Sequence, residues 1–197
     1  MNKEFWNERY STESFAYGVE PNDYLKQFSF ATNSRILCLA EGEGRNGVFL
    51  ALNGHDVECI DYSEKAIAKT HQLAEMNNVS LKTRCLDLFE LDLPDNTWDG
   101  IVIIFGHFPE ELRKKVHQQL YRALKSNGRL IIEAYSKEQI HRNSGGPRST
   151  DLLYSREELL KDFADFVNFE INELDREVNE GIFHNGMASI IRFVGIK

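Results

Sequence analysis

Near the end of its first quarter the sequence reads Ile36-Leu37-Cys38-Leu39-Ala40-Glu41-Gly42-Glu43-Gly44-Arg45-Asn46-Gly47, an apolar run followed by closely spaced glycines. A short apolar run bounded by turn residues is typical of a buried strand, and glycines allow the sharp turn that leads into a helix. In an open α/β sheet, ligands bind beyond the carboxyl ends of the strands, where such glycines let a ligand approach the backbone. The stretch therefore predicts a ligand site at the first strand–helix turn.

From Arg35 onward, short apolar runs alternate with longer helical patterns. This alternation is typical of repeated strand–helix units and a mostly parallel sheet. Gly54, Ser63 and Pro109 mark helix boundaries, as a stop, a cap and a first-turn proline. We expect strands at 35–40, 56–60, 81–85, 98–105 and 128–135, and helices at 46–52, 63–77 and 110–125.

The C-terminal third has a different organisation. A turn-rich loop at 143–149 precedes a capping box, Ser155 with Glu158, which predicts a further helix. Two apolar runs, 166–178 and 187–196, are joined by a connection containing Gly181 and Asn185-Gly186, so they predict an antiparallel pair. The expected fold is a Rossmann-like α/β sheet of seven strands, mostly parallel with one antiparallel strand, with helices on both faces. The length of 197 residues favours a single domain, 1–197.

The N-terminal segment 1–34 is much richer in aromatic residues than the chain average of 11%. Such a segment should dock on the rest of the protein. It could be a plain helix packed on the sheet, or it could fold over the ligand site as a lid, and both can be true. Its aromatic residues are Phe5, Trp6, Tyr10, Phe15, Tyr17, Tyr24, Phe28 and Phe30.

Composition excludes several classes of protein. The net charge of −8 and the pI near 5.3 oppose a phosphate backbone, so we expect no nucleic-acid partner. No apolar run is long enough to span a membrane, and the first ten residues are polar where a signal peptide would be apolar, which favours a cytoplasmic protein. The cysteines lack the paired spacing of a zinc site, so we expect no metal and three reduced core residues, Cys38, Cys59 and Cys85.

The charge of the glycine turn indicates which ligand it binds. Gly42, Gly44 and Gly47 satisfy the G-x-G-x-x-G pattern of dinucleotide-binding proteins, but that pattern is weak when taken alone. Glu41 and Glu43 would repel a pyrophosphate at the start of the helix. S-adenosylmethionine carries a sulfonium and an ammonium against one carboxylate, so an acidic turn attracts it as a net cation. We therefore expect S-adenosylmethionine as the cofactor.

Acidic residues also follow the next two strands. Asp61 closes the second strand, where a carboxylate can accept hydrogen bonds from ribose hydroxyls, or can cap the next helix. Asp87 follows the third strand, where it can reach the exocyclic amine of an adenine, or can be an exposed loop carboxylate. Acids after three successive strands make a stronger case for a nucleoside site than any one of them.

Several segments resemble the class I S-adenosylmethionine-dependent methyltransferases, and within them the branch of the tellurite-resistance and thiopurine methyltransferases. They are Phe5-Trp6-Asn7-Glu8-Arg9-Tyr10, Tyr17-Gly18-Val19-Glu20-Pro21-Asn22, Ala40 to Asn46, Asp61-Tyr62-Ser63 and Gly128-Arg129-Leu130. The resemblance implies that Gly42 and Gly44 cradle the methionine part of the cofactor, that Asp61 holds the ribose, and that Asp87 with Leu88 meets the adenine. It extends the expected cofactor site to Trp6, Tyr10, Tyr17, Arg45, Asn46, Tyr62, Ser63 and Phe105.

The sequence departs from the pattern of this family at two positions. Cys38 stands where the family has an acid, and Ala40 stands where it has the first glycine. We expect Glu41, three positions further on, to substitute for that acid.

The resemblance also indicates where an acceptor would bind. The residues after strand four border the transferring methyl group in this family, so His107 could orient or deprotonate an acceptor, since a neutral imidazole is a suitable base near pH 7. It could also simply cap the helix at Pro109. His184 matches a region near the acceptor pocket of the tellurite-resistance branch, or lies in a surface turn. Three arginines in or near the turn-rich loop at 143–149 could hold an anionic substrate or be merely solvated: Arg142, Arg148 and Arg156.

Methyl transfer to a small-molecule acceptor is the function that the sequence favours. Displacement at a sulfonium needs mainly alignment of the reactants, so a thiol or a chalcogen compound suits a chain with no obvious catalytic dyad. Two alternatives stay open: a nicotinamide-dependent oxidoreductase, and a non-catalytic protein that binds S-adenosylmethionine. We expect a monomer or a homodimer.

Overall fold

The computed structural model describes residues 2–197 and contains a sheet of seven strands in the order β3-β2-β1-β4-β5-β7-β6. The first five strands pair in parallel, and β7 runs antiparallel to both of its neighbours. This confirms the predicted sheet with one reversed strand. The strands are β1 (Arg35–Leu39), β2 (Asp56–Asp61), β3 (Lys82–Cys85), β4 (Trp98–Ile104), β5 (Leu124–Tyr135), β6 (Asn168–Glu180) and β7 (His184–Ile196).

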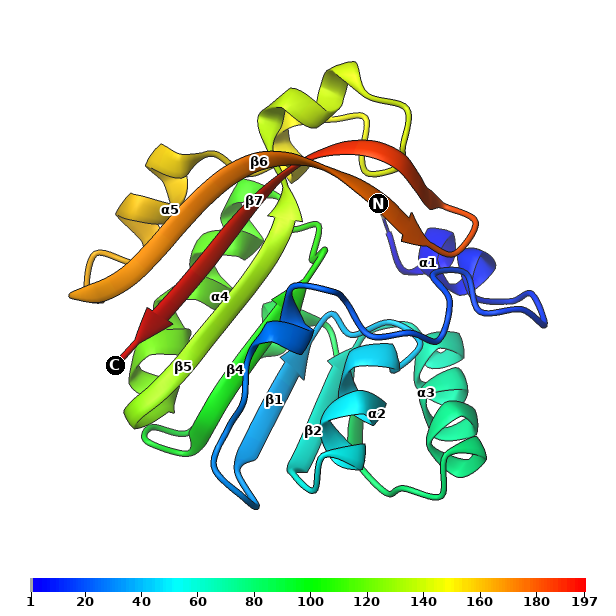
Figure 1. Ribbon diagram of the computed structural model, residues 1–197, viewed down its shortest axis with the longest axis horizontal. Helices are drawn as coiled ribbons and strands as arrows, with labels where there is room; N and C mark the ends of the chain where they lie inside the picture. Colours follow the sequence, from blue (N-terminus) through cyan, green and yellow to red (C-terminus); the bar gives the residue numbers. More distant parts are fainter. Residues whose placement is uncertain (1) are drawn as a thin grey trace.

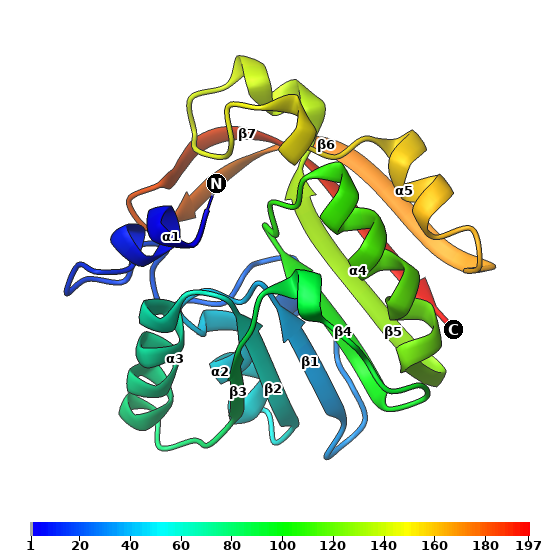
Figure 2. The same cartoon turned by 180° about the vertical axis from the view of Figure 1, so that it is seen from behind.

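Helices cover both faces of the sheet, as expected (Figure 1; Figure 2). On one face lie α2 (Arg45–Leu52) and α3 (Glu64–Met76), and on the other α4 (Glu110–Ala123) and α5 (Arg156–Asp162). The short helix α1 (Lys3–Arg9) packs against α3. Four short 3-10 turns complete the elements: η1 (Leu25–Gln27), η2 (Leu88–Glu90), η3 (Lys137–His141) and η4 (Thr150–Leu152).

The central strands are apolar on both sides because both faces of the sheet are covered. Along β1, Leu37 and Leu39 join the core cluster that contains residues of α4 and α5. Ile36 and Cys38 join the cluster on the opposite face, which contains Leu50 of α2. The continuous apolar run in the sequence is therefore a strand buried on both sides.

The predicted caps are present. The Ser63 side chain accepts a hydrogen bond from the Ala66 amide at the start of α3. Ser155 and Glu158 form the predicted capping box at the start of α5. Local capping chemistry thus defines where these two helices begin.

Two predictions near the sheet edges were wrong. Asn185-Gly186 does not form the connection between the last strands; it lies inside β7, paired with β6, and the turn occupies residues 181–183. Gly181, at φ +71°, supplies the left-handed conformation for that turn. Cys85 is exposed rather than part of the core, because β3 is a short strand at the edge of the sheet, whereas Cys38 and Cys59 are buried in β1 and β2.

The fold places two elements beyond the carboxyl ends of the parallel strands. The long hairpin of β6 and β7 bends over this end of the sheet, and α1 lies facing its tip (Figure 1). The segment after α1 contacts the hairpin turn, since the Ile182 amide donates to the Ala16 carbonyl oxygen. Within residues 2–197, no helix combines the length and the apolar character needed to cross a membrane.

Candidate cofactor and acceptor site

Two adjoining cavities lie at the carboxyl ends of the parallel strands, and they share Trp6, Tyr10, Ala40, Phe105 and His107. The larger measures about 380 Å³ and the smaller about 40 Å³. The structure brings most of the predicted site residues to these walls and leaves Gly44 and Ser63 away from them. The predicted residues that line a cavity are Trp6, Tyr10, Tyr17, Glu41, Gly42, Arg45, Asn46, Asp61, Tyr62, Asp87, Leu88, Phe105, His107 and His184.

Acidic residues from the ends of β2 and β3 lie on the wall of the larger cavity. Asp61 is buried, and its two carboxylate oxygens accept the amides of Gly42 and Ser63, each at 2.9 Å. Burial raises the pKa of Asp61 to about 6. Asp87 is exposed and accepts the Phe89 amide at 2.9 Å as the cap of η2. A carboxylate oxygen accepts more than one hydrogen bond, so both residues retain capacity for a ligand.

The glutamates of the glycine turn do not point into water. Oε1 of Glu41 accepts the amides of Asn46 and Gly47, both at 2.8 Å, and so caps α2. Burial raises the pKa of Glu41 to about 7. Glu43 forms a buried ion pair with Lys69 at 2.7 Å. Both glutamates line the smaller cavity, but donors of the protein already hold their carboxylates.

Two residues on the shared wall have a left-handed backbone conformation without being glycine. Ala40, at the end of β1, has φ +51°, and Phe105, at the end of β4, has φ +53°. Side chains rarely adopt this region, and it is unusual for a bulky ring. At Ala40, where the resemblance implies a glycine, the backbone thus has the left-handed conformation that glycine favours.

Gly44 and Ser63, both predicted to contact the cofactor, line neither cavity and have structural roles. Gly44 is the cap residue of α2 at φ +90°, and a Cβ atom there would lie within 3 Å of Thr70 on α3. The Ser63 hydroxyl donates to Asn7 Oδ1 at 2.7 Å and so ties α1 to α3. A glycine and a cap can serve helix packing as well as a ligand, so the contact of these two residues with the cofactor stays a prediction.

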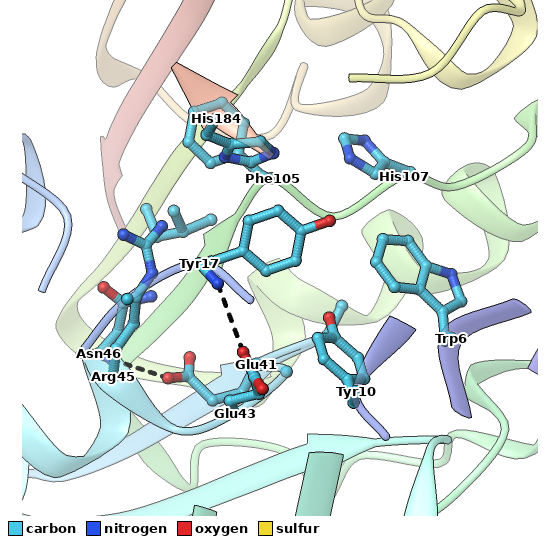
Figure 3. A pocket seen from close by; sticks show the side chains of 14 residues that line it. Trp6, Tyr10, Tyr17, Glu41, Glu43, Arg45, Asn46, Phe105, His107 and His184 are labelled. Atoms are coloured by element: carbon cyan, nitrogen blue, oxygen red, sulfur yellow. Dashed lines mark hydrogen bonds between the residues drawn. The ribbon is translucent and has the colours of Figure 1, made fainter. Parts of the chain in front are cut away.

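Five rings meet beside the shared wall, and we call Tyr17, Phe105, His107, Tyr135 and His184 the aromatic chamber. The His184 ring lies 4.4 Å from Tyr17, 4.7 Å from Phe105 and 5.2 Å from Tyr135, centroid to centroid. His107 stacks on Tyr135 at 5.9 Å. Figure 3 shows Tyr17, Phe105, His107 and His184 around the pocket, with Arg45 and Asn46 on the side away from His107 and Trp6.

Tyr135 is a member of the aromatic chamber that sequence reasoning missed. It ends β5, within the strand predicted at 128–135, and the alignment of strand ends at one edge of a parallel sheet was the signal that could have identified it.

The aromatic chamber contains polar atoms that have no hydrogen-bond partner. Among residues 2–197, these buried atoms include His107 Nδ1, His184 Nδ1 and the Tyr135 hydroxyl. Burial lowers the pKa of His107 to about 3 and also lowers that of His184, so both imidazoles are neutral at pH 7. Buried polar groups are normally paired, because an unpaired one costs about 1–3 kcal/mol. Three such atoms together make the chamber a candidate binding site.

The N-terminal segment forms one side of both cavities. Trp6 and Tyr10 line both cavities, and Tyr17 lines the smaller one. The segment is anchored to the glycine turn, since the Ala16 amide donates to Glu43 at 2.7 Å. It is therefore a docked segment with a helix, and its side chains reach the candidate site.

The arginines divide into two groups. Arg45 lines the smaller cavity, where its guanidinium contacts Glu180 Oε2 at 2.6 Å. The three arginines in or near the turn-rich loop at 143–149 line neither cavity, so they do not form an anion site in either cavity. Arg142 binds Asp175 and Ser189, Arg148 binds the loop itself, and Arg156 donates to the Ile171 carbonyl oxygen. In residues 2–197 no group of His, Cys, Asp or Glu could hold a metal ion.

The chain is similar to known methyltransferases. A family described as a methyltransferase domain matches residues 36–128. The "Uncharacterized methyltransferase YbaJ" of Bacillus subtilis is 35% identical over 49% of this chain and 38% of its own length. The "Probable S-adenosyl-L-methionine-dependent methyltransferase TehB" of Haemophilus influenzae is 24% identical over 84% of this chain and 57% of its own. Thiopurine S-methyltransferase of Pseudomonas fluorescens is 26% identical over 71% of this chain and 73% of its own length.

The structure agrees with these relatives. The crystal structure of TehB from Haemophilus influenzae superposes with a TM-score of 0.70, at 22% identity, over 99% of this chain and 66% of that one. The chain spans only 38% to 57% of the length of YbaJ and TehB. Together with the sheet order and the acids at the strand ends, these similarities show that the chain resembles the class I S-adenosylmethionine-dependent methyltransferases, and among them TehB and thiopurine methyltransferase.

Proposed function

We propose that the chain transfers the methyl group of S-adenosylmethionine to a small, soft acceptor such as a thiol or a reduced chalcogen compound. The observation that carries the proposal is the junction of two cavities at Ala40, Phe105 and His107. On one side of this junction lie the acids that suit a nucleoside. On the other side lies the aromatic chamber with its unpartnered polar atoms.

The residues present fit the cofactor. The larger cavity, at about 380 Å³, lies within the range of about 300–1,000 Å³ for small-molecule sites. Asp61 offers carboxylate oxygens to the ribose hydroxyls, and Asp87 with Leu88 borders the position of the adenine. Glu41 lines the smaller cavity, and its carboxylate, although it also accepts two amides of α2, faces the ammonium group in place of the acid that the family has at Cys38. When bound, S-adenosylmethionine supplies a methyl group already activated by its sulfonium.

The chemistry of the chamber favours an acceptor that needs little deprotonation. With a pKa of about 3, His107 is a poor base. Moving a proton to it from a thiol of pKa near 8.5 would cost about 7 kcal/mol. His107 therefore orients the acceptor by a hydrogen bond rather than deprotonating it. A thiolate or a chalcogen anion suits this site, and the similarity to a thiopurine S-methyltransferase and to TehB supports that choice.

The remaining expectations belong to the same proposal. The chain acts as one domain, 1–197, with segment 1–34 as a lid over the cofactor. Its partner is a small molecule rather than a nucleic acid, because the net charge of −8 repels phosphates. We expect it to work in the cytoplasm as a monomer or a homodimer.

Thermal-shift titration followed by isotope transfer tests the proposal. S-adenosylhomocysteine should raise the melting temperature and NADH should not. Label from methyl-labelled S-adenosylmethionine should then appear in products from a panel of small thiols and of tellurite and selenite reduction products. Stabilisation by NADH alone would support the oxidoreductase alternative. Binding with no labelled product from any acceptor would support a non-catalytic binding protein.

A further inference from the structure

A buried ion cluster lies directly behind the aromatic chamber, and we define it as Asn22, Arg45, Glu133, Arg176 and Glu180. It joins the N-terminal segment, α2, β5 and β6. Glu133 is fully buried. Its Oε1 accepts hydrogen bonds from the Arg176 guanidinium at 2.5 Å and from the side-chain amide of Asn22 at 2.7 Å. Its Oε2 accepts from Arg192 on β7 at 2.7 Å. The cluster thus connects the segment over the site with the hairpin that bends over it.

Glu180 is the carboxylate of the ion cluster that approaches His184 of the aromatic chamber. It is the last residue of β6 and pairs in register with His184, the first residue of β7. Its Oε1 accepts from Arg176 at 2.7 Å and from Asn22 at 3.2 Å, while Oε2 accepts from Arg45 at 2.6 Å. His184 Nδ1 lies 3.8 Å from Oε2.

The two nitrogens of His184 have different surroundings. Nδ1 is buried with no hydrogen-bond partner, and the carboxylate of Glu180 is within 4 Å of it. The ring itself lines the smaller cavity, packed against Tyr17 and Phe105. A neutral imidazole carries one N–H, and the hydrogen bond of one nitrogen determines which nitrogen that is.

We propose that Glu180 is a positioning residue that holds His184 as the Nδ1–H tautomer and leaves the lone pair of Nε2 to the aromatic chamber. An N–H beside a buried carboxylate is favourable, whereas a lone pair there would face negative charge. The two atoms are 3.8 Å apart, and a contraction of about 0.6 Å would bring them to hydrogen-bond distance. Nε2 can then accept a hydrogen bond from an acceptor that still carries its proton. This role of Nε2 rests on the proposed function, but the tautomer does not.

The charges around His184 agree with a neutral ring. Glu180 faces it from β6, and this single carboxylate is shared with Arg176 on β6 and Arg45 on α2. Burial raises the pKa of Glu180, but His184 and the two arginines outweigh this effect and hold that pKa well below its usual range. Burial lowers the pKa of His184, Glu180 opposes this by raising it, and the two arginines lower it again, so that the net direction is downward. The other groups that face the ring are His107, Tyr17 and Tyr135.

Nitrogen NMR of the whole protein tests the proposal without cofactor or acceptor. The imidazole ¹⁵N shifts and their couplings to ring protons identify the tautomer of each of the six histidines, and His184→Gln assigns the signal of His184. At pH 7.5 we expect His184 to be protonated at Nδ1. Protonation at Nε2 in the unaltered chain would overturn the proposal, whether or not methyl transfer is observed.

A pair of variants separates positioning from general stability. Glu180→Gln keeps the shape but removes the carboxylate, and should shift His184 at least partly to the Nε2–H tautomer. Glu133→Gln removes a carboxylate of the same buried ion cluster that is not paired with His184, and should leave the tautomer unchanged. An unchanged tautomer in Glu180→Gln, or the same shift in both variants, would contradict the proposal. If Glu180→Gln does not fold, Glu180→Asp, which retracts the carboxylate by one methylene, replaces it.

Discussion

At the level of single residues, the carboxylates around the glycine turn are organised before any ligand binds. Asp61 holds the amides of Gly42 and Ser63, and Glu41 holds two amides at the start of α2. Preorganised acceptors lower the cost of ordering the site when a ligand arrives. The same burial makes these two acids weak, with pKa values of about 6 and about 7. Affinity and pH dependence therefore originate from the same side chains.

Asp61→Asn should weaken the binding of S-adenosylhomocysteine by about 1–3 kcal/mol, or about 5- to 150-fold in Kd, because a buried charged acceptor is lost. Isothermal titration at pH 8 measures the change. Asp87→Asn is the matched control, since Asp87 is exposed, and it should have a smaller effect. An unchanged Kd in Asp61→Asn would remove Asp61 from the site.

Asp61 should also make the stability of the free protein depend on pH. Its pKa is about 6 in the folded state against 3.8 for the ordinary group, so between these values the folded chain binds more protons than the unfolded chain. The contribution of Asp61 to the free energy of unfolding is therefore greatest below about pH 4 and falls as pH rises towards 6. The slope is at most about 1.4 kcal/mol per pH unit. Urea unfolding of the protein and of Asp61→Asn from pH 4 to 8 measures it, and parallel curves would contradict the prediction.

At the level of elements, the N-terminal segment is held by a buried ion pair rather than by apolar packing alone. Glu43, in the glycine turn, pairs with Lys69 on α3 and accepts the Ala16 amide. Lys69 also donates to the Ser14 carbonyl oxygen at 2.6 Å. The turn that precedes α2 is thus tied to the segment that borders the cavities.

Glu43→Ala should loosen residues 11–20, because it leaves Lys69 as a buried charge without its partner, at a cost of about 3–5 kcal/mol. Limited proteolysis should then cleave within this segment faster than in the unaltered chain. Glu64→Ala is the control: its pair with Lys3 also ties α1 to α3 but is exposed and contributes little. Equal cleavage rates in both variants would show that the segment is held by other contacts.

For the molecule as a whole, the site is a meeting point of segments distant in sequence. The two cavities are lined by residues of the N-terminal segment, of the turns after β1, β2, β3 and β4, and of the start of β7. A ligand that bridges these segments stabilises them together. At a concentration of about 100 times Kd, it adds about 2.7 kcal/mol to the free energy of unfolding.

S-adenosylhomocysteine should therefore slow amide hydrogen exchange in two places at once, in residues 2–24 and in the hairpin turn around 181–186. The contact between Ile182 and Ala16 couples them. Exchange measured by mass spectrometry, with and without ligand, tests this, and the amides of α5, remote from the cavities, serve as the internal control. Protection limited to the glycine turn would contradict the role of segment 1–34 as a lid.

The succession of strands and helices, the helix caps and the acids at the strand ends could be predicted because they depend on local signals. The apolar runs, the cap at Ser63 and the acids at the strand ends all act within a few residues of chain. The parallel arrangement then brings the strand ends to one edge, whatever the details of packing. Asp61, Asp87 and the residues around the glycine turn were identified in this way.

The partners of these residues were decided only by tertiary packing. Nothing near Glu43 in the chain indicates Lys69, and nothing near Glu180 indicates Arg45, although both pairs are buried at less than 3 Å. The unpartnered atoms of the aromatic chamber also depend on five rings from different segments. Burial and the low-dielectric surroundings of a side chain arise from the whole fold, so the pKa values and the orientation of His184 follow from the packed structure and not from the local order of residues.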